Sequence, residues 1–191
     1  IRLTATCVRV PVFVGHSEAV TIEFENPISA DEARDILRNA PGCLVIDKSS
    51  AFRMDPNVPL VIPEINAGRI RDHKGIIANP NCSAITALVP LWPIHRQNRI
   101  KRMIVSTYQA ASGAGAAAME ELVESTRAYL VGRPFTPKVI PLPYAFNVFS
   151  HNTAIDPETG YNDEETKVIK ESRKILEDEH IAIGVTCVRV P

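Results

Sequence analysis

One strand-like segment occurs twice in this sequence, and this repeat constrains the fold more than any other feature. Residues 1–11 (IRLTATCVRVP) and residues 181–191 (IAIGVTCVRVP) align without a gap and are identical at seven of eleven positions. The unit is too short, and its copies are too distant, for a solenoid repeat. A single copy of a fold offers one place for such a strand, so the two copies compete for it.

Strand-like and helix-like segments alternate between these two ends. Apolar or alternating stretches predict strands at residues 1–14, 18–25, 43–47, 60–62, 75–78, 99–108 and 181–190. Helix signals predict helices at residues 30–39, 82–92 and 116–131, and from Asn162 or Asp163 through residue 176. The interleaving predicts an α/β or α+β fold with a mixed sheet and packed helices.

Local chemistry marks several of these helices. Ser29-Ala30-Asp31-Glu32 is a capping box, so a helix should begin there. Pro90 and Pro93 should kink or shorten the helix that begins near Cys82. In the two later helices, apolar residues recur at helical spacing: Met119, Leu122, Val123 and Leu130, then Val168, Ile169, Ile175 and Leu176.

Charge and cysteine content exclude some classes of protein. The formal net charge is -1, which provides no strong attraction for nucleic acid or membrane. The longest apolar run, residues 85–94, is too short to cross a bilayer. The four cysteines form no CxxC pair, so no metal site is expected. We expect reduced thiols in a cytoplasm, or in a plastid stroma if the source is a plant or alga.

Cys82 is the first candidate for catalysis. A strand should end before Asn79-Pro80, and Cys82 then stands at the start of a helix. The free N–H groups and positive dipole end there favour a thiolate and can stabilise an oxyanion. The alternative is a buried structural cysteine, which the position alone favours because free cysteines are among the most buried residues.

A thiolate nucleophile usually works with an acid/base group, and His16 is the strongest candidate. It follows Gly15 in an expected turn between two strands, where functional groups are often displayed. His95 is expected to be packed or on the surface, while His73 and His180 stand among charged residues and should be solvated. For any lone histidine, the structural interpretation is the more common one.

Three further groups carry weaker signals. Ser112-Gly113-Ala114-Gly115 precedes a helix, which suits a phosphate loop but more often marks a tight turn. Acidic residues in the first turn of the helix at residues 163–176 also suit the helix dipole. Arg9 and Arg189 stand between valines and should point to the opposite face of their strands, into a polar cleft.

Together these pieces resemble aspartate-semialdehyde dehydrogenase over nearly the whole chain. The resemblance is carried by five segments: SSAFRMDPNVPLVIPEIN (49–66), NPNCS (79–83), VSTYQAASGAG (105–115), NDEETK (162–167) and TCVRVPVFVGHSEAV (6–20). Agreement of several long motifs is far more specific than one short motif. The resemblance implies the fold of the catalytic and dimerisation domain of that family.

The resemblance also implies roles for individual residues. Four of them would act on the reacting group: Cys82 as the nucleophile, His16 as the acid/base, Gln109 as a residue that places the substrate or thioacyl intermediate, and Asn81 beside the nucleophile. Four would bind the substrate: Arg9 its carboxylate, Glu165 its amine, and Arg53 with Lys167 its phosphate. Arginine suits a carboxylate because its planar fork donates two parallel hydrogen bonds.

The implied reaction is the reductive dephosphorylation of L-aspartyl-4-phosphate to L-aspartate 4-semialdehyde through a cysteine thioester, with NADPH. The family makes lysine, threonine and methionine precursors, and a homodimer or homotetramer is implied. Ser112 and Gly113 are the remaining candidates for contact with NADP.

The sequence departs from the family pattern in three respects. No glycine-rich loop precedes residue 43, so the main dinucleotide site should be incomplete. In the family, the segment similar to residues 1–42 comes after the segment similar to residues 181–191, whereas in this chain it comes first. The TCVRVP strand is also duplicated. Permutation, design, recombination or an incomplete gene model each explain this order. We expect residues 1–42 to be a permuted catalytic segment, 43–78 a remnant of the NADP-binding domain, and 79–191 the catalytic and dimerisation domain.

Two other functions fit less well. The chain could be a non-catalytic fragment that binds an aspartate-like ligand or phosphate and pairs with a full-length subunit. A papain-like thiol hydrolase would rest only on a Cys and a His. Because only the first TCVRVP copy continues to His16, we expect Arg9 rather than Arg189 to line the thiol site. The short connection of the second copy to its preceding helix opposes this expectation.

Overall fold

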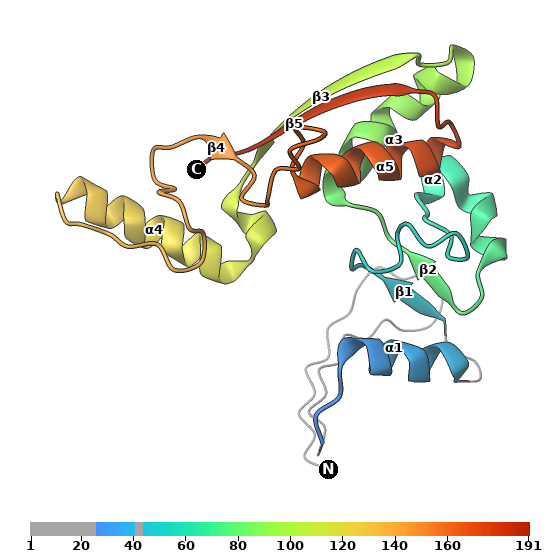
Figure 1. The fold of residues 1–191 in the computed structure, drawn as a ribbon, viewed down its shortest axis with the longest axis horizontal. Helices are drawn as coiled ribbons and strands as arrows, with labels where there is room; N and C mark the ends of the chain where they lie inside the picture. The colour runs from blue at the N-terminus through green and yellow to red at the C-terminus, as the bar shows by residue number, and fades with distance from the viewer. Residues whose placement is uncertain (1–25, 41–43) are drawn as a thin grey trace, which may run out of the picture.

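The computed structural model describes residues 26–40 and 44–191 (Figure 1). The predicted strands at 1–14 and 18–25, together with Arg9, His16 and Cys43, lie outside the described residues. The helices are α1 (Ala30–Asn39), α2 (Pro63–Asn66), η1 (Ala67–Asp72), α3 (Cys82–Gln97), η2 (Ala111–Ala114), α4 (Ala116–Leu130) and α5 (Asp163–Leu176). The strands are β1 (Val45–Asp47), β2 (Ile76–Ala78), β3 (Arg102–Gln109), β4 (Phe149–Ser150) and β5 (Ala182–Arg189).

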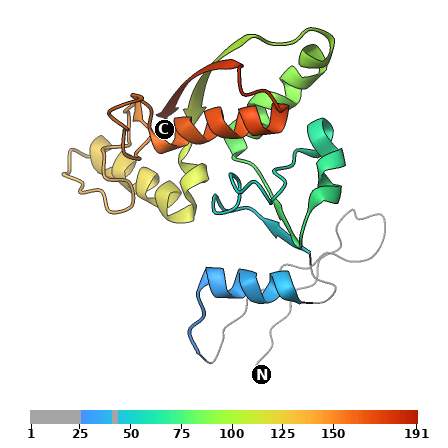
Figure 2. The same cartoon turned by 45° about the vertical axis from the view of Figure 1, so that its right-hand side comes forward.

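The described strands form two small sheets. β1 pairs in parallel with β2. In the other sheet β5 is central, parallel to β3 on one side and antiparallel to β4 on the other. Helices α3 and α5 lie along this second sheet, while α4 and the loop that follows it extend from its far end (Figures 1 and 2). The predicted mixed sheet with packed helices is therefore confirmed.

The C-terminal copy of the repeated segment occupies the centre of the larger sheet. Along β5, Ile183, Val185 and Cys187 are buried against the helices, and their neighbours are more exposed. Arg189 continues the same alternation and is also buried. The expectation that a valine-flanked arginine points away from its neighbours is confirmed for this copy.

Helix starts follow the local sequence closely. Ser29 caps α1 in a complete capping box with Glu32, as predicted. Asn162 caps α5 in the same way, with the Glu165 side chain accepting from the Asn162 backbone N–H. Each box satisfies two backbone N–H groups that a helix otherwise leaves without partners.

Two predicted elements were wrong in extent. Residues 60–62 form no strand: Leu60 makes one isolated bridge with Ala78, because prolines at 59 and 63 lack the N–H that a ladder needs. Helix α3 was expected to be kinked or shortened at its prolines, and it is not shortened, because it continues to Gln97. Both prolines lie on its exposed side.

The expected apolar stripe of α4 is buried only at Leu122, which is half-buried and packs against the small core that holds Ala118 and Ile140. Met119, Val123 and Leu130 are exposed, whereas Ala118 and Glu121 are buried. The carboxylate of Glu121 explains this orientation, because it accepts the backbone N–H groups of residues 138–140 from the loop after α4. Helical spacing located the stripe, but a polar anchor determines which face of the helix packs.

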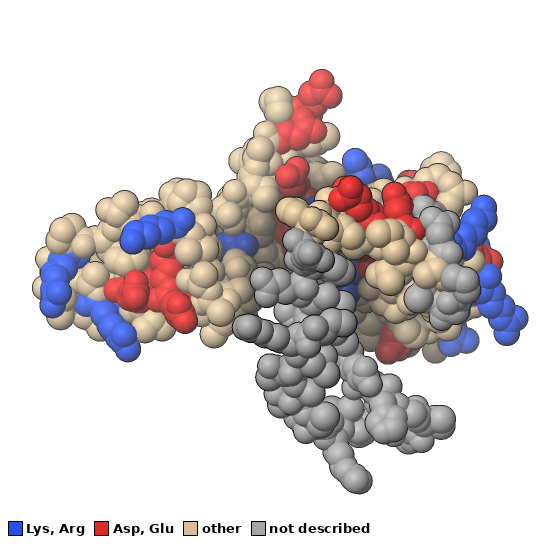
Figure 3. All heavy atoms as spheres, turned by 90° about the horizontal axis from the view of Figure 1, so that it is seen from below, with Lys and Arg blue, Asp and Glu red and all other residues tan. Residues whose placement is uncertain are grey.

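Charged side chains of both signs are intermixed over the face that Figure 3 presents, without a broad field of one sign. This pattern agrees with the small net charge of the whole chain. No helix among the described residues is both long enough and apolar enough to span a membrane.

Candidate functional site

A cleft of about 520 Å³ opens where the carboxyl ends of β3 and β5 meet the first turns of α3 and α5. The ends of parallel strands and the N-termini of helices commonly form binding sites in mixed folds. The polar side chains that line the cleft include Cys82, Gln109, Ser112, His151, Glu164 and Arg189.

Cys82 is the first residue of α3, and it is a free, exposed thiol. The residue before it, Asn81, caps the helix by accepting from the backbone N–H of Ser83 at 2.8 Å and of Ala84 at 3.4 Å. The other described cysteine, Cys187, is fully buried. Burial raises the pKa of the Cys187 thiol, and the nearby carboxylates act in the same direction. Of these two thiols, the one that faces the cleft is Cys82.

A small hydrogen-bond network fixes the groups around this thiol. Glu164 Oε1 accepts from Asn81 Nδ2 at 2.9 Å and from Gln109 Nε2 at 3.4 Å. Gln109 Nε2 also donates to Ser83 Oγ at 2.8 Å. The network therefore joins the first turn of α3, the end of β3 and the first turn of α5 on one side of the cleft.

Glu165, which sequence reasoning selected for the substrate amine, does not line the cleft. Its Oε2 accepts from the backbone N–H of Asn162 at 2.9 Å, and its Oε1 accepts from the backbone N–H of Cys187 at 2.8 Å. Both oxygens are thus used by the cap of α5 and by its contact with β5. The neighbouring Glu164 faces the thiol instead, because adjacent residues of a helix point in different directions.

Arg189 is the last residue of β5, next to Gln109 of β3, and only 6% of its surface is exposed. Its Nε donates to Asn152 Oδ1 at 2.8 Å, and its Nη2 lies 3.0 Å from His151 Nε2. Among the described residues, Nη1 has no hydrogen-bond partner, and the side chain borders the cleft. Among the described residues, Arg189 is the arginine of the repeated segment that borders the cleft, and β5, which carries it, pairs with β3. Arg9 lies outside the described residues, so the expectation that it lines the thiol site stays a prediction.

The predicted phosphate pair, Arg53 and Lys167, borders a separate hollow of about 230 Å³. Arg53 is already engaged: its three nitrogens contact the Asn79 carbonyl, the Lys48 carbonyl and the Glu171 carboxylate, the last at 3.0 Å. Lys167 Nζ is 3.9 Å from Glu164 Oε2. Lys167 is therefore the more available cation of the pair, and it stands beside the cleft that holds Cys82.

Ser112 and Gly113, the remaining cofactor candidates, lie in η2 at the rim of the same cleft. Gly113 has open space where a Cβ would stand, so nothing in the protein requires glycine there. Both residues are exposed. They border the same cleft as the Cys82 thiol.

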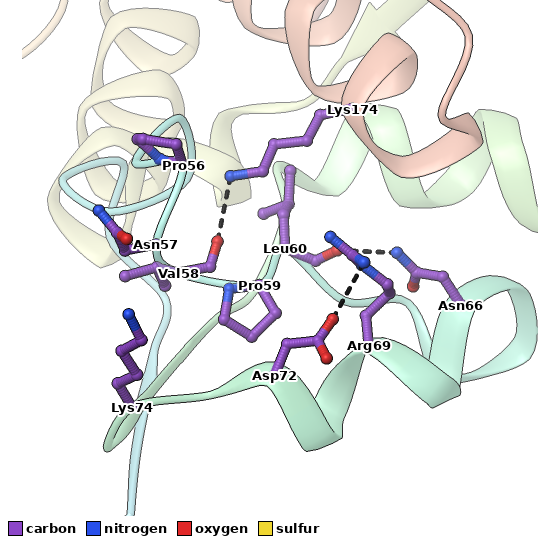
Figure 4. Close-up of a pocket in the computed structure, with 10 residues that line it drawn as sticks. All are labelled: Pro56, Asn57, Val58, Pro59, Leu60, Asn66, Arg69, Asp72, Lys74 and Lys174. Atoms are coloured by element: carbon purple, nitrogen blue, oxygen red, sulfur yellow. Dashed lines mark hydrogen bonds and ion pairs between the residues drawn. The ribbon is translucent and has the colours of Figure 1, made fainter.

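A further hollow, of about 180 Å³, lies between the segment 56–60 and η1, and Lys174 of α5 also lines it (Figure 4). Lys174 reaches into it and donates to three backbone carbonyls, those of Arg53, Asp55 and Val58. Burial lowers the pKa of Lys174. All three ammonium donors are used by the backbone, so this lysine has a structural role: it holds the segment 53–58 against α5.

Sequence reasoning missed four residues that shape the site: His151, Asn152, Glu164 and Glu171. Glu164 lies in a motif that was selected, one position from the residue chosen. The other three carry no local signal, since each acts through contacts with residues far away in the sequence. His16 and Arg9 lie outside the described residues.

Comparison with known proteins identifies relatives over most of the chain. The family model for the semialdehyde dehydrogenase dimerisation domain matches residues 2–78 and 91–191. Over 150 residues the chain is 51% identical to the aspartate-semialdehyde dehydrogenase of Synechocystis, covering 78% of this chain and 44% of that protein. Over 154 residues it is 51% identical to the enzyme of Aquifex aeolicus, covering 78% and 45%.

A solved structure gives the same result. Aspartate semialdehyde dehydrogenase II from Vibrio cholerae, complexed with ASA, is similar with a TM-score of 0.75 and 42% identity, covering 78% of this chain and 44% of that one. The chain thus spans about half the length of the relatives that it matches.

Proposed function

This chain belongs to the aspartate-semialdehyde dehydrogenase family, and from that premise we propose that it carries the thiol site of such an enzyme. The observation that supports this most directly is one cleft that holds an exposed thiol at a helix start, an arginine and a carboxylate: Cys82, Arg189 and Glu164. An amino acid with a reactive carbonyl presents the matching groups, namely an electrophilic carbon, a carboxylate and an amine.

In the proposed reaction, the Cys82 thiolate attacks the carbonyl carbon of L-aspartyl-4-phosphate. The S–C bond forms, the C–O bond to phosphate breaks, and inorganic phosphate leaves with the bonding electrons. Asn81 Oδ1 already accepts from the N–H groups of Ser83 and Ala84, so the backbone N–H of Cys82 is the donor at the start of α3 that would stabilise the developing oxyanion. NADPH, when bound, supplies the hydride that converts the thioester to L-aspartate 4-semialdehyde.

The substrate would be held from two sides. We assign its carboxylate to Arg189, since Nη1 has no partner among the described residues and guanidinium matches carboxylate geometry. We assign its amine to Glu164 in place of Glu165, because Glu164 borders the cleft. Lys167 would assist the phosphate, and Gln109 and Asn81 would keep the nucleophile and carbonyl in register. His16 remains the proposed acid/base by resemblance.

The cofactor of the proposed reaction is NADP. Ser112 and Gly113 could contact the nicotinamide end of NADP, but the sequence carries no glycine-rich loop before residue 43 for the pyrophosphate. We therefore expect weak NADP binding by this chain. Both curated relatives named above come from bacteria, and a cytoplasmic location is proposed by that kinship; they give no support for a plastid.

We also propose that the chain forms a homodimer, since the matched family model is described as a dimerisation domain. The face of β3 that lies away from the helices carries the exposed apolar side chains of Ile104 and Tyr108. If this face is the interface, sedimentation should give a dimer for the natural chain and a monomer for Ile104→Lys. A dimer that persists in that variant would place the interface elsewhere.

The thiol chemistry can be tested without NADP. Incubation of the chain with L-aspartyl-4-phosphate should give a hydroxylamine-sensitive adduct on Cys82, detected by intact mass and peptide mapping, and Cys82→Ser should give none. A folded chain that binds the substrate analogue but forms no adduct would instead support a second candidate. That candidate is a non-catalytic unit that binds an aspartate-like ligand and pairs with a full-length subunit. It is favoured by the coverage of the relatives, since the chain matches only 44% of the Synechocystis enzyme.

A further inference from the structure

The guanidinium that borders the cleft is not held by its own strand. Among the described residues, both of its hydrogen-bond partners come from the loop after β4: Asn152 Oδ1 accepts from Nε, and His151 Nε2 lies 3.0 Å from Nη2. These residues precede Arg189 by 37 and 38 positions. Two acceptors on one edge of the guanidinium leave its other edge, with Nη1, directed to the cleft.

The contact with His151 defines the state of the imidazole. Arginine can only donate, so His151 Nε2 must be the acceptor and the ring must be neutral, with its proton on Nδ1. Burial lowers the pKa of His151, and Arg189 lowers it further. The other charges that face the ring are Glu164 and Glu165, which raise the pKa, and Lys167, which lowers it. Thr153 Oγ1 lies 3.4 Å from Nδ1 and can accept a hydrogen bond from the Nδ1–H group.

We propose that His151 and Asn152 are positioning residues that orient Arg189 for a ligand carboxylate, with neutral His151 as an obligatory hydrogen-bond acceptor. This inference rests on the proposed function, since it assigns Arg189 to the carboxylate. It adds a specificity element on the loop after β4, which no motif of the sequence indicated. A long arginine side chain loses substantial rotamer freedom when it is fixed, and two prior anchors remove that loss from ligand binding.

A direct role for His151 as a base towards Cys82 is the competing explanation. Both residues line the cleft. However, the Nε2 of His151 is occupied by Arg189, and its Nδ1 lies against Thr153. The two explanations differ in what must be retained at position 151: an acceptor for the positioning role, but a titrating ring for the base.

The test measures protection of Cys82 in the full 191-residue chain. L-aspartate 4-semialdehyde adds reversibly to the thiol, and the readout is the concentration that halves the rate of iodoacetamide labelling at Cys82. The matched control ligand is 3-aminopropanal, which has the same aldehyde and amine but lacks the carboxylate. Urea unfolding of each variant separates binding from loss of fold.

His151→Leu removes the acceptor and should raise the half-protection concentration of the semialdehyde about tenfold. His151→Gln keeps an acceptor at a similar reach and should remain within about threefold of the natural chain. Neither change should alter protection by 3-aminopropanal. In an Arg189→Lys background, His151→Leu should cost less than about twofold, because its effect acts through the arginine.

Three results would overturn the inference. They are an equal loss for His151→Leu with both ligands, an equal loss in both backgrounds, or a His151→Gln variant as impaired as His151→Leu. The last result would instead support the imidazole as a base. Failure of the proposed function looks different: Arg189→Lys alone would then leave protection by the semialdehyde unchanged.

Discussion

Glu171 and Arg53 form a buried ion pair beneath the turn that carries Cys82, with 3.0 Å between Oε1 and Nη1. The second oxygen of Glu171 accepts the backbone N–H of Asn81 at 2.6 Å. Arg53 in turn donates from Nε to the carbonyl of Asn79. The pair therefore holds the backbone on both sides of Pro80, two residues before the thiol, and ties it to α5.

Glu171→Gln should destabilise the protein by about 3 kcal/mol, because it leaves a buried guanidinium without its counter-ion. The matched control is Glu177→Gln, which breaks an exposed pair with Arg69 and should cost less than about 1 kcal/mol. Urea unfolding at neutral pH measures both changes. Equal, small losses in the two variants would mean that the buried pair contributes little to stability.

Cys82 should react faster with iodoacetamide than Cys187, by at least about tenfold, because it is exposed at a helix start while Cys187 is buried with a raised pKa. Limited labelling near neutral pH followed by peptide mapping gives the order. Preferential labelling of Cys187 in the folded chain would contradict the placement of the thiol site.

Glu164 and Glu165 should separate into a binding role and a structural role. Glu164→Gln should weaken protection of Cys82 by L-aspartate 4-semialdehyde about tenfold, since the amine loses its counter-charge. Glu165→Gln should leave protection nearly unchanged but should lower stability by about 1 kcal/mol, because it disturbs the cap at Asn162. The reverse pattern would restore the original assignment of Glu165.

Arg189→Lys should weaken protection of Cys82 by the semialdehyde about tenfold or more, because lysine cannot make a bidentate contact with the carboxylate. Arg9→Lys is the natural control, since Arg9 has the same place in the repeated segment. We expect the Arg9 variant to change protection much less. A larger effect at Arg9 would mean that the N-terminal copy serves the site in solution.

The ionisation of Glu121 should make the stability of the folded chain depend on pH in the acid range. Burial by itself would raise its pKa, but the backbone N–H groups of Ile140, Lys138 and Val139 bind the carboxylate and the net pKa is lowered. A lowered pKa in the folded state stabilises the protein above the ordinary carboxyl range, and this stabilisation is lost as the pH falls through the folded-state value.

Glu121→Gln should therefore cost about 2 kcal/mol near neutral pH and progressively less in the acid range. The exposed neighbour Glu120 provides the control, and Glu120→Gln should be nearly neutral at both pH values. Urea unfolding across the acid range measures the slope. A cost for Glu121→Gln that is independent of pH would show that the charge of this carboxylate does not anchor the loop.

Local signals in the sequence predicted the elements that depend on neighbouring residues. The capping box at Ser29, the cap at Asn162 and the helix start at Cys82 all appear as expected, because a cap is completed within one turn of chain. The alternation around Arg189 was also readable, since side chains in a strand point to opposite faces in turn.

The sequence by itself determined that this chain carries a thiol at a helix start, a mixed sheet and two competing copies of one strand. Only the tertiary structure decided that β5 fills the sheet, that Glu164 rather than Glu165 faces the cleft, and that Arg189 is held by residues 37 and 38 positions away. The reason is physical. Caps and alternation arise from bonds between near neighbours, whereas strand choice and side-chain partners are set by packing between segments that meet only in the folded chain.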